Sequence, residues 1–132
     1  MATPQGKAKT MRKLIFAAAM TIAAGAAYAA PVQTVASDKG DVLAGENGMT
    51  LYTFKKDEKG KSNCYEQCAA NWPPLAATAD DKADGAYTVI DRTDGTKQWA
   101  KDGMPLYFWV KDEKKGDVTG DGVGGNWDLA RP

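Results

Sequence analysis

Residues 48–59 read GMTLYTFKKDEK and residues 103–114 read GMPLYFWVKDEK, so Gly48 matches Gly103 and eight of the twelve positions are identical. A fixed period of this kind is typical of two copies of one supersecondary unit, neither of which buries its apolar face alone. We therefore expect two repeats of about 55 residues, at about 40–75 and 95–130, that share one core. The same offset, without a gap, carries Asn71-Trp72 onto Asn126-Trp127 and Gly40 onto Gly95.

Turn signals recur at matched places in the two copies. Asn47-Gly48 separates residues 41–44 from residues 50–54, and Asp102-Gly103 lies at the same point of the second copy. Both dipeptides tolerate the positive φ angles of a type I′ turn, whose twist suits paired strands. Asp94-Gly95 predicts a further hairpin, between residues 87–91 and the strand that starts at Thr96. The expected fold class is therefore mainly β, with one hairpin unit in each repeat.

Strand alternation assigns the side chains of these hairpins to faces. Tyr52 and Phe54 share one face, as do Tyr107 and Trp109, while the leucines before the tyrosines point the other way. Between the hairpins, residues 63–70 contain Ala, Glu and Gln without a helix breaker, and they predict one short helix before the prolines that follow Trp72.

Residues 1–29 have the pattern of a signal peptide. A basic start precedes an uncharged run over residues 14–27, and Ala27-Tyr28-Ala29 supplies the small residues that signal peptidase requires. The run is shorter than the ~20 residues needed to span a bilayer. No cysteine lies directly at the expected cleavage point, so we expect no lipid anchor. The mature chain should begin at Ala30 and work in the periplasm or outside the cell.

Cleavage would leave 103 of the 132 residues, enough for one core, so residues 30–132 are expected to form a single domain. Removing four of the 17 basic residues and none of the 17 acidic ones leaves 13 against 17, a net charge of −4. An acidic chain without a basic stripe argues against nucleic acid and against anionic membrane surfaces as partners.

The two copies contain one further shared pattern. Tyr52-x-Phe54-x-x-Asp57 and Tyr107-x-Trp109-x-x-Asp112 resemble the Yx(FWY)xxD signature of a family of bacterial secreted repeats, described as predicted lipoproteins of unknown function. The resemblance extends to residues 64–75 and 116–120 and covers nearly all of the expected mature chain. It implies no established reaction. Lipoprotein members have a lipidated N-terminal cysteine. This chain has none at the expected mature N-terminus, so membrane anchoring does not carry over to it.

Cys64 and Cys68 are the two cysteines of the chain, and an even number in an exported protein indicates a disulfide. In a helix, residues i and i+4 lie about 6.2 Å apart at Cα, which is within the range of about 4.4–6.8 Å that disulfides use. The alternative is Cu(I) held by two thiolates and Met49 or Met104, because soft ligands select Cu(I). We favour the structural disulfide and expect no cofactor, because the chain has no histidine to complete a copper site.

A second candidate metal site lies in the glycine-rich segment that follows the second motif. Asp117, Thr119, Asp121 and Asp128 resemble the spacing of an EF-hand calcium loop. The last ligand is Asp where an EF-hand has Glu, and no flanking helices are predicted. We favour the interpretation of this segment as a structural loop.

The remaining candidate side chains also have a structural interpretation. Asp57 and Asp112 invite acid–base catalysis, yet each ends a strand, where Asp commonly accepts backbone N–H groups. The tryptophans could stack on a sugar or a quinone, but the simpler hypothesis is the shared core of two repeats. They are Trp72, Trp99, Trp109 and Trp127.

Catalytic groups are scarce in this sequence. It contains no histidine, no phosphate-binding loop and no Cys-x-x-Cys, and its serines, Ser37 and Ser62, are not in a nucleophile-elbow context. We therefore expect no enzyme. The leading hypothesis is a non-catalytic extracytoplasmic binding or scaffold module with an unknown envelope partner. The alternative is a small copper or thiol-redox accessory protein that uses Cys64 and Cys68.

Overall fold

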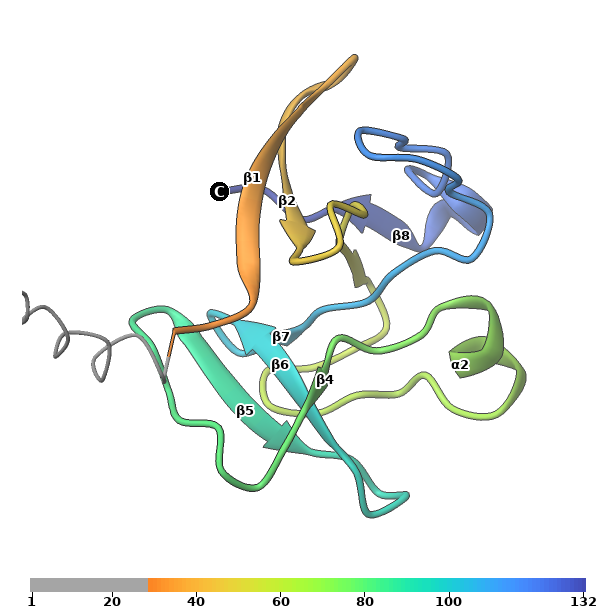
Figure 1. Cartoon of the computed structure of the whole chain (residues 1–132). Coiled ribbons are helices and arrows are strands. Elements are labelled where there is room, and N and C mark those ends of the chain that lie inside the picture. The colour runs from red at the N-terminus through yellow and green to blue at the C-terminus, as the bar shows by residue number, and fades with distance from the viewer. Residues whose placement is uncertain (1–28) are drawn as a thin grey trace, which may run out of the picture.

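The computed structural model describes residues 29–132, so the expected signal peptide lies outside the described residues except for Ala29. The fold is mainly β with one short helix, as predicted (Figure 1). Among the residues that the structure describes, no helix is long and apolar enough to cross a membrane. The elements are β1 (Val32–Ser37), β2 (Gly40–Gly45), β3 (Tyr52–Phe54), α2 (Gln67–Asn71), β4 (Ala76–Ala77), β5 (Tyr87–Asp91), β6 (Lys97–Lys101), β7 (Met104–Pro105), η3 (Val123–Gly125) and β8 (Trp127–Leu129).

Each repeat is an antiparallel hairpin followed by a turn and a short third segment. In the second repeat β5 pairs with β6 and β6 pairs with β7, which confirms the hairpins predicted at Asp94-Gly95 and Asp102-Gly103. In the first repeat β2 pairs with β1. The third segment of this repeat, β3, pairs with β8 of the second repeat. The hairpin predicted at Asn47-Gly48 also forms, over the same short extent as the β6–β7 pair: Ala44 bridges Thr50, Gly45 N–H donates to Met49 O and Leu51 N–H donates to Leu43 O. The expected pairing of residues 41–44 with 50–54 does not continue past Leu51, because β3 pairs with β8 instead.

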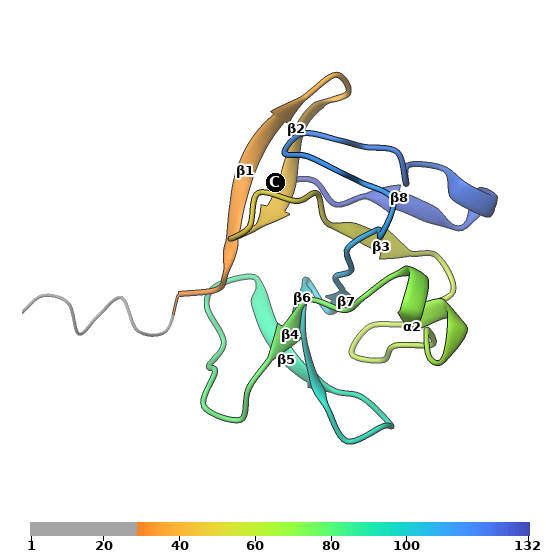
Figure 2. The same ribbon diagram turned by 45° about the vertical axis from the view of Figure 1, so that its right-hand side comes forward.

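Each repeat ends in a segment that pairs with the other repeat, and we call these segments, residues 71–75 and 126–130, the tails. The second tail contains β8, which pairs with β3 of the first repeat. The first tail runs beside residues 107–110, where Pro73 O accepts Phe108 N–H at 2.8 Å. Figures 1 and 2 show the result: one half of the molecule combines β1 and β2 with β8, and the other combines β5 and β6 with β4.

The two repeats meet at an antiparallel contact between Tyr52 and Tyr107, which are equivalent residues. Tyr52 N–H donates to Tyr107 O at 2.8 Å, and Tyr107 N–H donates to Tyr52 O at 3.0 Å. Beside them the tails repeat one bond, from Leu75 N–H to Leu106 O at 2.9 Å and from Ala130 N–H to Leu51 O at 3.0 Å. A pseudo-twofold axis therefore passes between the two tyrosines.

The ungapped repeat hides two differences in turn length that cancel. Leu43 N–H bonds to Ala130 O, and Trp99 N–H bonds to Leu75 O in the same way, so Leu43 and Trp99 are structural counterparts. The sequence offset that relates Tyr52 to Tyr107 would instead match Leu43 with Gln98. The turn before β6 is one residue longer than the turn before β2, and the turn after β6 is one residue shorter than the turn after β2. The match of Gly40 with Gly95 is therefore wrong, because Gly95 (φ +91°) belongs to the longer turn.

Both repeats contribute to each of two apolar clusters on the two faces of the central contact. The first contains the motif tyrosines and Phe54, with Trp109 packed against it, and the second contains the leucines that precede the tyrosines, as strand alternation predicts. The first cluster consists of Val35, Val42, Ala44, Tyr52, Phe54, Cys64, Trp72, Tyr107, Trp127 and Leu129. The second consists of Leu43, Leu51, Leu75, Trp99, Leu106 and Ala130.

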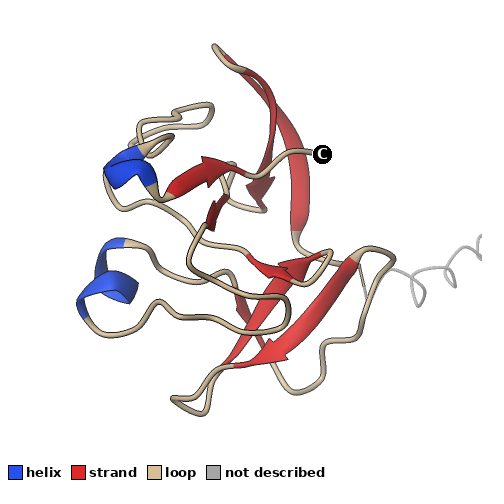
Figure 3. Ribbon diagram, turned by 180° about the vertical axis from the view of Figure 1, so that it is seen from behind, coloured by secondary structure: helices blue, strands red, loops and turns tan. Residues whose placement is uncertain are grey.

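The helix is shorter than predicted. It spans Gln67–Asn71, whereas the sequence indicated residues 63–70 (Figure 3). Asn63 N–H and Cys64 N–H donate to the side chains of Asp57 and Ser62, so these residues are held in an irregular loop before the helix begins. Glu66, at φ 56°, then turns the chain into the helix.

Candidate functional site

The tyrosines and aspartates of the two motifs are crossed between the repeats. Tyr52 Oη donates to Asp112 Oδ2 at 2.7 Å, and Tyr107 Oη donates to Asp57 Oδ2 at 2.6 Å. All four side chains are buried. The other oxygen of each carboxylate accepts a loop N–H, from Asn63 on Asp57 and from Thr119 on Asp112. Each motif therefore joins the two repeats and fixes the loop that follows its own aspartate.

Burial and hydrogen bonding make the two phenols weaker acids. Burial first, and then the hydrogen-bonded carboxylate, raise the pKa of Tyr52 and of Tyr107 far above the usual value of 10.0. Both phenols therefore remain hydrogen-bond donors at any physiological pH.

The pair of Tyr107 and Asp57 belongs to a larger buried polar network. Ser62 Oγ lies 2.6 Å from Tyr107 Oη and accepts a bond from Arg92 Nη1 at 3.0 Å. The Arg92 guanidinium, buried in the second repeat, also donates to Gln98 Oε1 and to Cys64 O. Its charge opposes the burial that raises the pKa of the Asp57 carboxyl, as do the hydrogen bonds from Tyr107 and Asn63.

Four aromatic rings form a stack across the pseudo-twofold axis. Trp72 and Trp127, equivalent residues of the two tails, lie face to face with ring centroids 3.7 Å apart and planes at 5°. Trp109 stacks on the outer face of Trp72 at 4.0 Å, and Phe54 stacks on Trp127 at 4.4 Å. Tyr52 meets Trp72 edge-on, and Tyr107 meets Trp127 in the same way.

The four tryptophans of the chain differ in burial. Trp72 and Trp127 of the stack and Trp99 of the second cluster are buried core residues. Trp109 is only half-buried.

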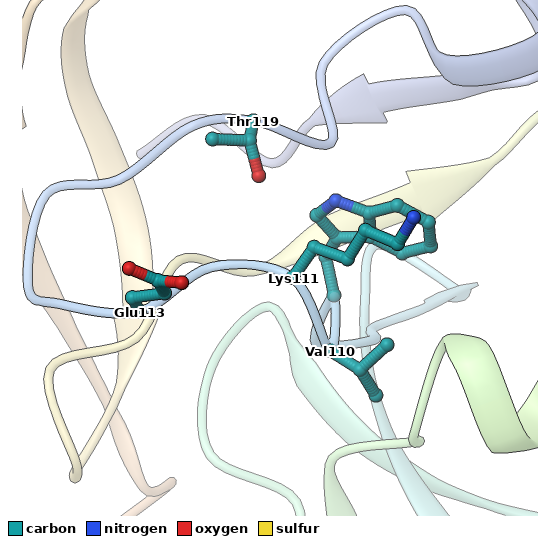
Figure 4. Close-up of a pocket in the computed structure, with 5 residues that line it drawn as sticks. Val110, Lys111, Glu113 and Thr119 are labelled. Atoms are coloured by element: carbon teal, nitrogen blue, oxygen red, sulfur yellow. The ribbon is translucent and has the colours of Figure 1, made fainter.

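The two ends of the stack differ in exposure. Phe54 is buried, whereas Trp109 lines an open pocket of about 560 Å³. Figure 4 shows the Lys111, Glu113 and Thr119 side chains around this opening, with Val110 at its edge. The Lys111 ammonium lies over the Trp109 ring, 6.0 Å from its centroid. We call Trp109, Val110, Lys111, Glu113 and Thr119 the Trp109 pocket.

Gly120 sets the position of the exposed end of the stack. A Cβ atom at this glycine would lie 2.9 Å from ring atoms of Trp72 and Tyr52 and 3.0 Å from Trp109. The backbone at Gly120 can therefore approach the rings closely, and its N–H donates to Tyr52 Oη at 3.1 Å. The loop that carries Thr119 is held against the stack by this contact.

Cys64 and Cys68 form a disulfide, with Cα atoms 5.2 Å apart. The distance is shorter than the helical value because Cys64 lies in the loop before α2 and only Cys68 lies in the helix. Cys64 is buried in the first cluster, and Cys68 packs against that cluster. The disulfide thus ties the start of the helix to the core, near the Arg92 network.

The four candidate calcium ligands have other partners. Asp117 accepts bonds from Glu113 N–H, Lys114 N–H and the Lys114 ammonium, and Thr119 donates its hydroxyl to Asp112. Asp121 and Asp128 pair with lysines, at 2.9 Å and 3.9 Å. Within residues 29–132 no three His, Cys, Asp or Glu side chains form a group that could hold a metal ion.

Sequence reasoning missed several residues of these sites. Ser62, Arg92 and Gln98 come together only in the folded structure, and no sequence spacing links them. Lys111 and Glu113 belong to the charged run of the second copy, and no signal in the sequence marks them as pocket residues. β1 was also missed, yet it was recoverable, because the repeat offset that relates Tyr52 to Tyr107 also matches Val32, where β1 begins, with Tyr87, where β5 begins.

A family model described as a secreted repeat of unknown function matches the chain twice, at residues 33–76 and 88–131. The matches begin within β1 and within β5 and extend past the two tails. No curated protein and no solved structure matches the chain.

The crossed tyrosine–aspartate bonds predict a matched loss of stability in two variants. Tyr52→Phe and Tyr107→Phe each remove one hydroxyl donor from a buried aspartate, which should lower the free energy of unfolding by about 1.5–3 kcal/mol. Chemical denaturation of each variant measures the loss. Tyr87→Phe is the control, because the Tyr87 hydroxyl makes no hydrogen bond within the described residues, and it should change stability by less than about 0.5 kcal/mol. Equal effects of all three substitutions would contradict the crossed bonds.

The raised pKa of Asp57 predicts a pH dependence of stability. A carboxyl whose folded pKa exceeds its unfolded value, about 3.9, contributes stability that is complete below that value and is lost as pH rises through the folded pKa. Asp57→Asn does not titrate at this position. The free energy of unfolding of the wild type minus that of Asp57→Asn should therefore fall as pH rises from about 4 to 8. A difference that rises with pH, or stays constant, would contradict the direction of the shift.

Proposed function

The chain belongs to this family of secreted repeats of unknown function, as its motifs indicate, and we propose that it is a non-catalytic extracytoplasmic binding module whose ligand surface is the Trp109 pocket. We place its action in the periplasm or outside the cell. The family description gives no ligand, so the proposal depends on the geometry of the pocket.

The observation that supports this proposal most is the asymmetry of the aromatic stack. The pseudo-twofold axis relates Trp109 to Phe54, and the core closes over Phe54 but not over Trp109. A large half-buried aromatic ring beside exposed charged groups is a typical anchor for a ligand. Next to it, Val110 is 50% exposed, and among residues 29–132 it is the large apolar side chain that remains exposed.

The rest of the chain supplies the rigidity that such a surface needs. Trp109 packs on Trp72, and Trp72 is in turn stacked on the buried Trp127. Asp112 and Gly120 fix the loop on the other side of the pocket through Tyr52 and Thr119. A preorganised surface binds with a smaller loss of conformational entropy.

Affinity capture from the cell envelope tests the proposal. Material retained by the immobilised wild-type protein should be lost with Trp109→Ala, because removing a central aromatic anchor costs about 2 kcal/mol, which is about thirtyfold in affinity. Lys111→Ala should also reduce capture, and Lys56→Ala is its matched control, since Lys56 is the equivalent residue of the first repeat and does not line the pocket. Capture that is equal for wild type and Trp109→Ala would refute the proposal.

The second candidate is a thiol-redox or copper role for Cys64 and Cys68, which the Arg92 guanidinium favours. It donates to the main-chain carbonyl oxygen of Cys64 at 2.7 Å, and a positive charge beside this residue would favour a thiolate at Cys64 once the disulfide is reduced. Thiol alkylation and metal analysis of protein isolated from the envelope separate the two functions. A disulfide that resists glutathione, with no copper bound, supports the binding module. Stoichiometric Cu(I) that protects both thiols, and is lost in Cys64→Ser, would establish the second candidate.

A further inference from the structure

We infer that the Trp109 pocket takes a glycan, with the face of one sugar ring on the indole and its hydroxyl groups on the side chains around it. This inference rests on the proposed binding function and assigns the chemical class of the ligand. Its evidence is the kind of hydrogen-bonding group that surrounds the exposed ring.

The indole offers an apolar surface that is only loosely covered. One face of Trp109 packs on Trp72, and on the pocket side the exposed Lys111 side chain lies across the ring at 6.0 Å. That distance is at the outer limit of a cation–π contact, and a lysine side chain moves aside at little cost. The apolar C–H face of a pyranose matches a surface of this size, because an indole face is negative and C–H groups are weakly positive.

The polar groups of the pocket match the edge of a sugar ring. Within residues 29–132, the Glu113 carboxylate and the Lys111 ammonium make no ion pair and no hydrogen bond, so both are available to a ligand. Thr119 uses its hydroxyl proton on Asp112 and keeps lone pairs free to accept a bond. Hydroxyl groups both donate and accept, so one sugar ring can donate to Glu113 and Thr119 and accept from Lys111.

Charge and shape distinguish a glycan from other ligands of an aromatic surface. The charges of Lys111 and Glu113 cancel, so the pocket selects neither a strongly anionic nor a strongly cationic ligand. A flat aromatic molecule would use the indole but make no hydrogen bond to the three polar groups, so it would gain only part of the interactions that a sugar ring can make. The pocket is open rather than enclosed, so a polymer can pass through it without a chain end.

Co-sedimentation of the mature protein with insoluble polysaccharides tests the inference. The probes are protein-free peptidoglycan sacculi and chitin, and the soluble competitor is a tetramer of N-acetylglucosamine. The wild type should sediment with at least one polysaccharide and be released by the tetramer. Sedimentation with sacculi alone would identify the cell wall as the source of the ligand, and sedimentation with chitin as well would extend recognition to extracellular polysaccharides.

The variants separate binding from folding. Glu113→Gln keeps the size of an exposed side chain and removes a charged acceptor, so the affinity should fall about tenfold while the melting temperature stays unchanged. Trp109→Ala should abolish sedimentation, and Lys56→Ala should leave it unchanged. Absence of wild-type binding to both polysaccharides and to the tetramer, or binding that survives Trp109→Ala, would overturn the glycan assignment. If envelope capture still requires Trp109 in that case, the pocket remains a binding site for another class of ligand; if capture does not, the proposed function fails as well.

Discussion

The reciprocal backbone contact of Tyr52 with Tyr107 is the constraint on which the rest of the molecule depends. Two equivalent residues exchange both of their peptide hydrogen bonds, and their side chains reach across the axis to the aspartate of the opposite motif. The geometry is that of an isologous interface, here formed within one chain. Each repeat therefore contributes one tail, one tryptophan of the stacked pair and one edge-on tyrosine to the region near the axis.

Departures from this symmetry are concentrated away from the axis. Arg92, at the base of the longer turn before β6, is buried and bonds to Ser62 and Cys64, whereas the first repeat has Ser37 at the equivalent position. The second repeat has Trp109 where the first has Phe54, and it leaves that ring beside an open pocket. Symmetry thus accounts for stability, while the asymmetric positions, which the shared fold does not require, are the ones available for a specific role.

The sequence predicted the features that depend on local pattern and on the repeat. The β fold class, the faces of Tyr52 and Leu51 and the turns at Asp94-Gly95 and Asp102-Gly103 follow from alternation and turn chemistry. Partner choice could not be predicted, because a tail that pairs with its own repeat and one that pairs with the other have the same pattern. The helix start at Gln67 was missed for a related reason: Asp57 and Ser62 bind the preceding N–H groups, and only the tertiary structure places them there.

The exchanged tails also govern the order in which this chain can fold. Leu43 N–H bonds to Ala130 O of the second tail, so the β1–β2 hairpin lacks this partner until the second repeat has been made. A chain that leaves a ribosome or an export channel N-terminus first therefore cannot complete these contacts before the second tail emerges. Contacts at such long sequence separation form slowly. This delay suits a secreted protein, because only an unfolded chain passes through a narrow export channel.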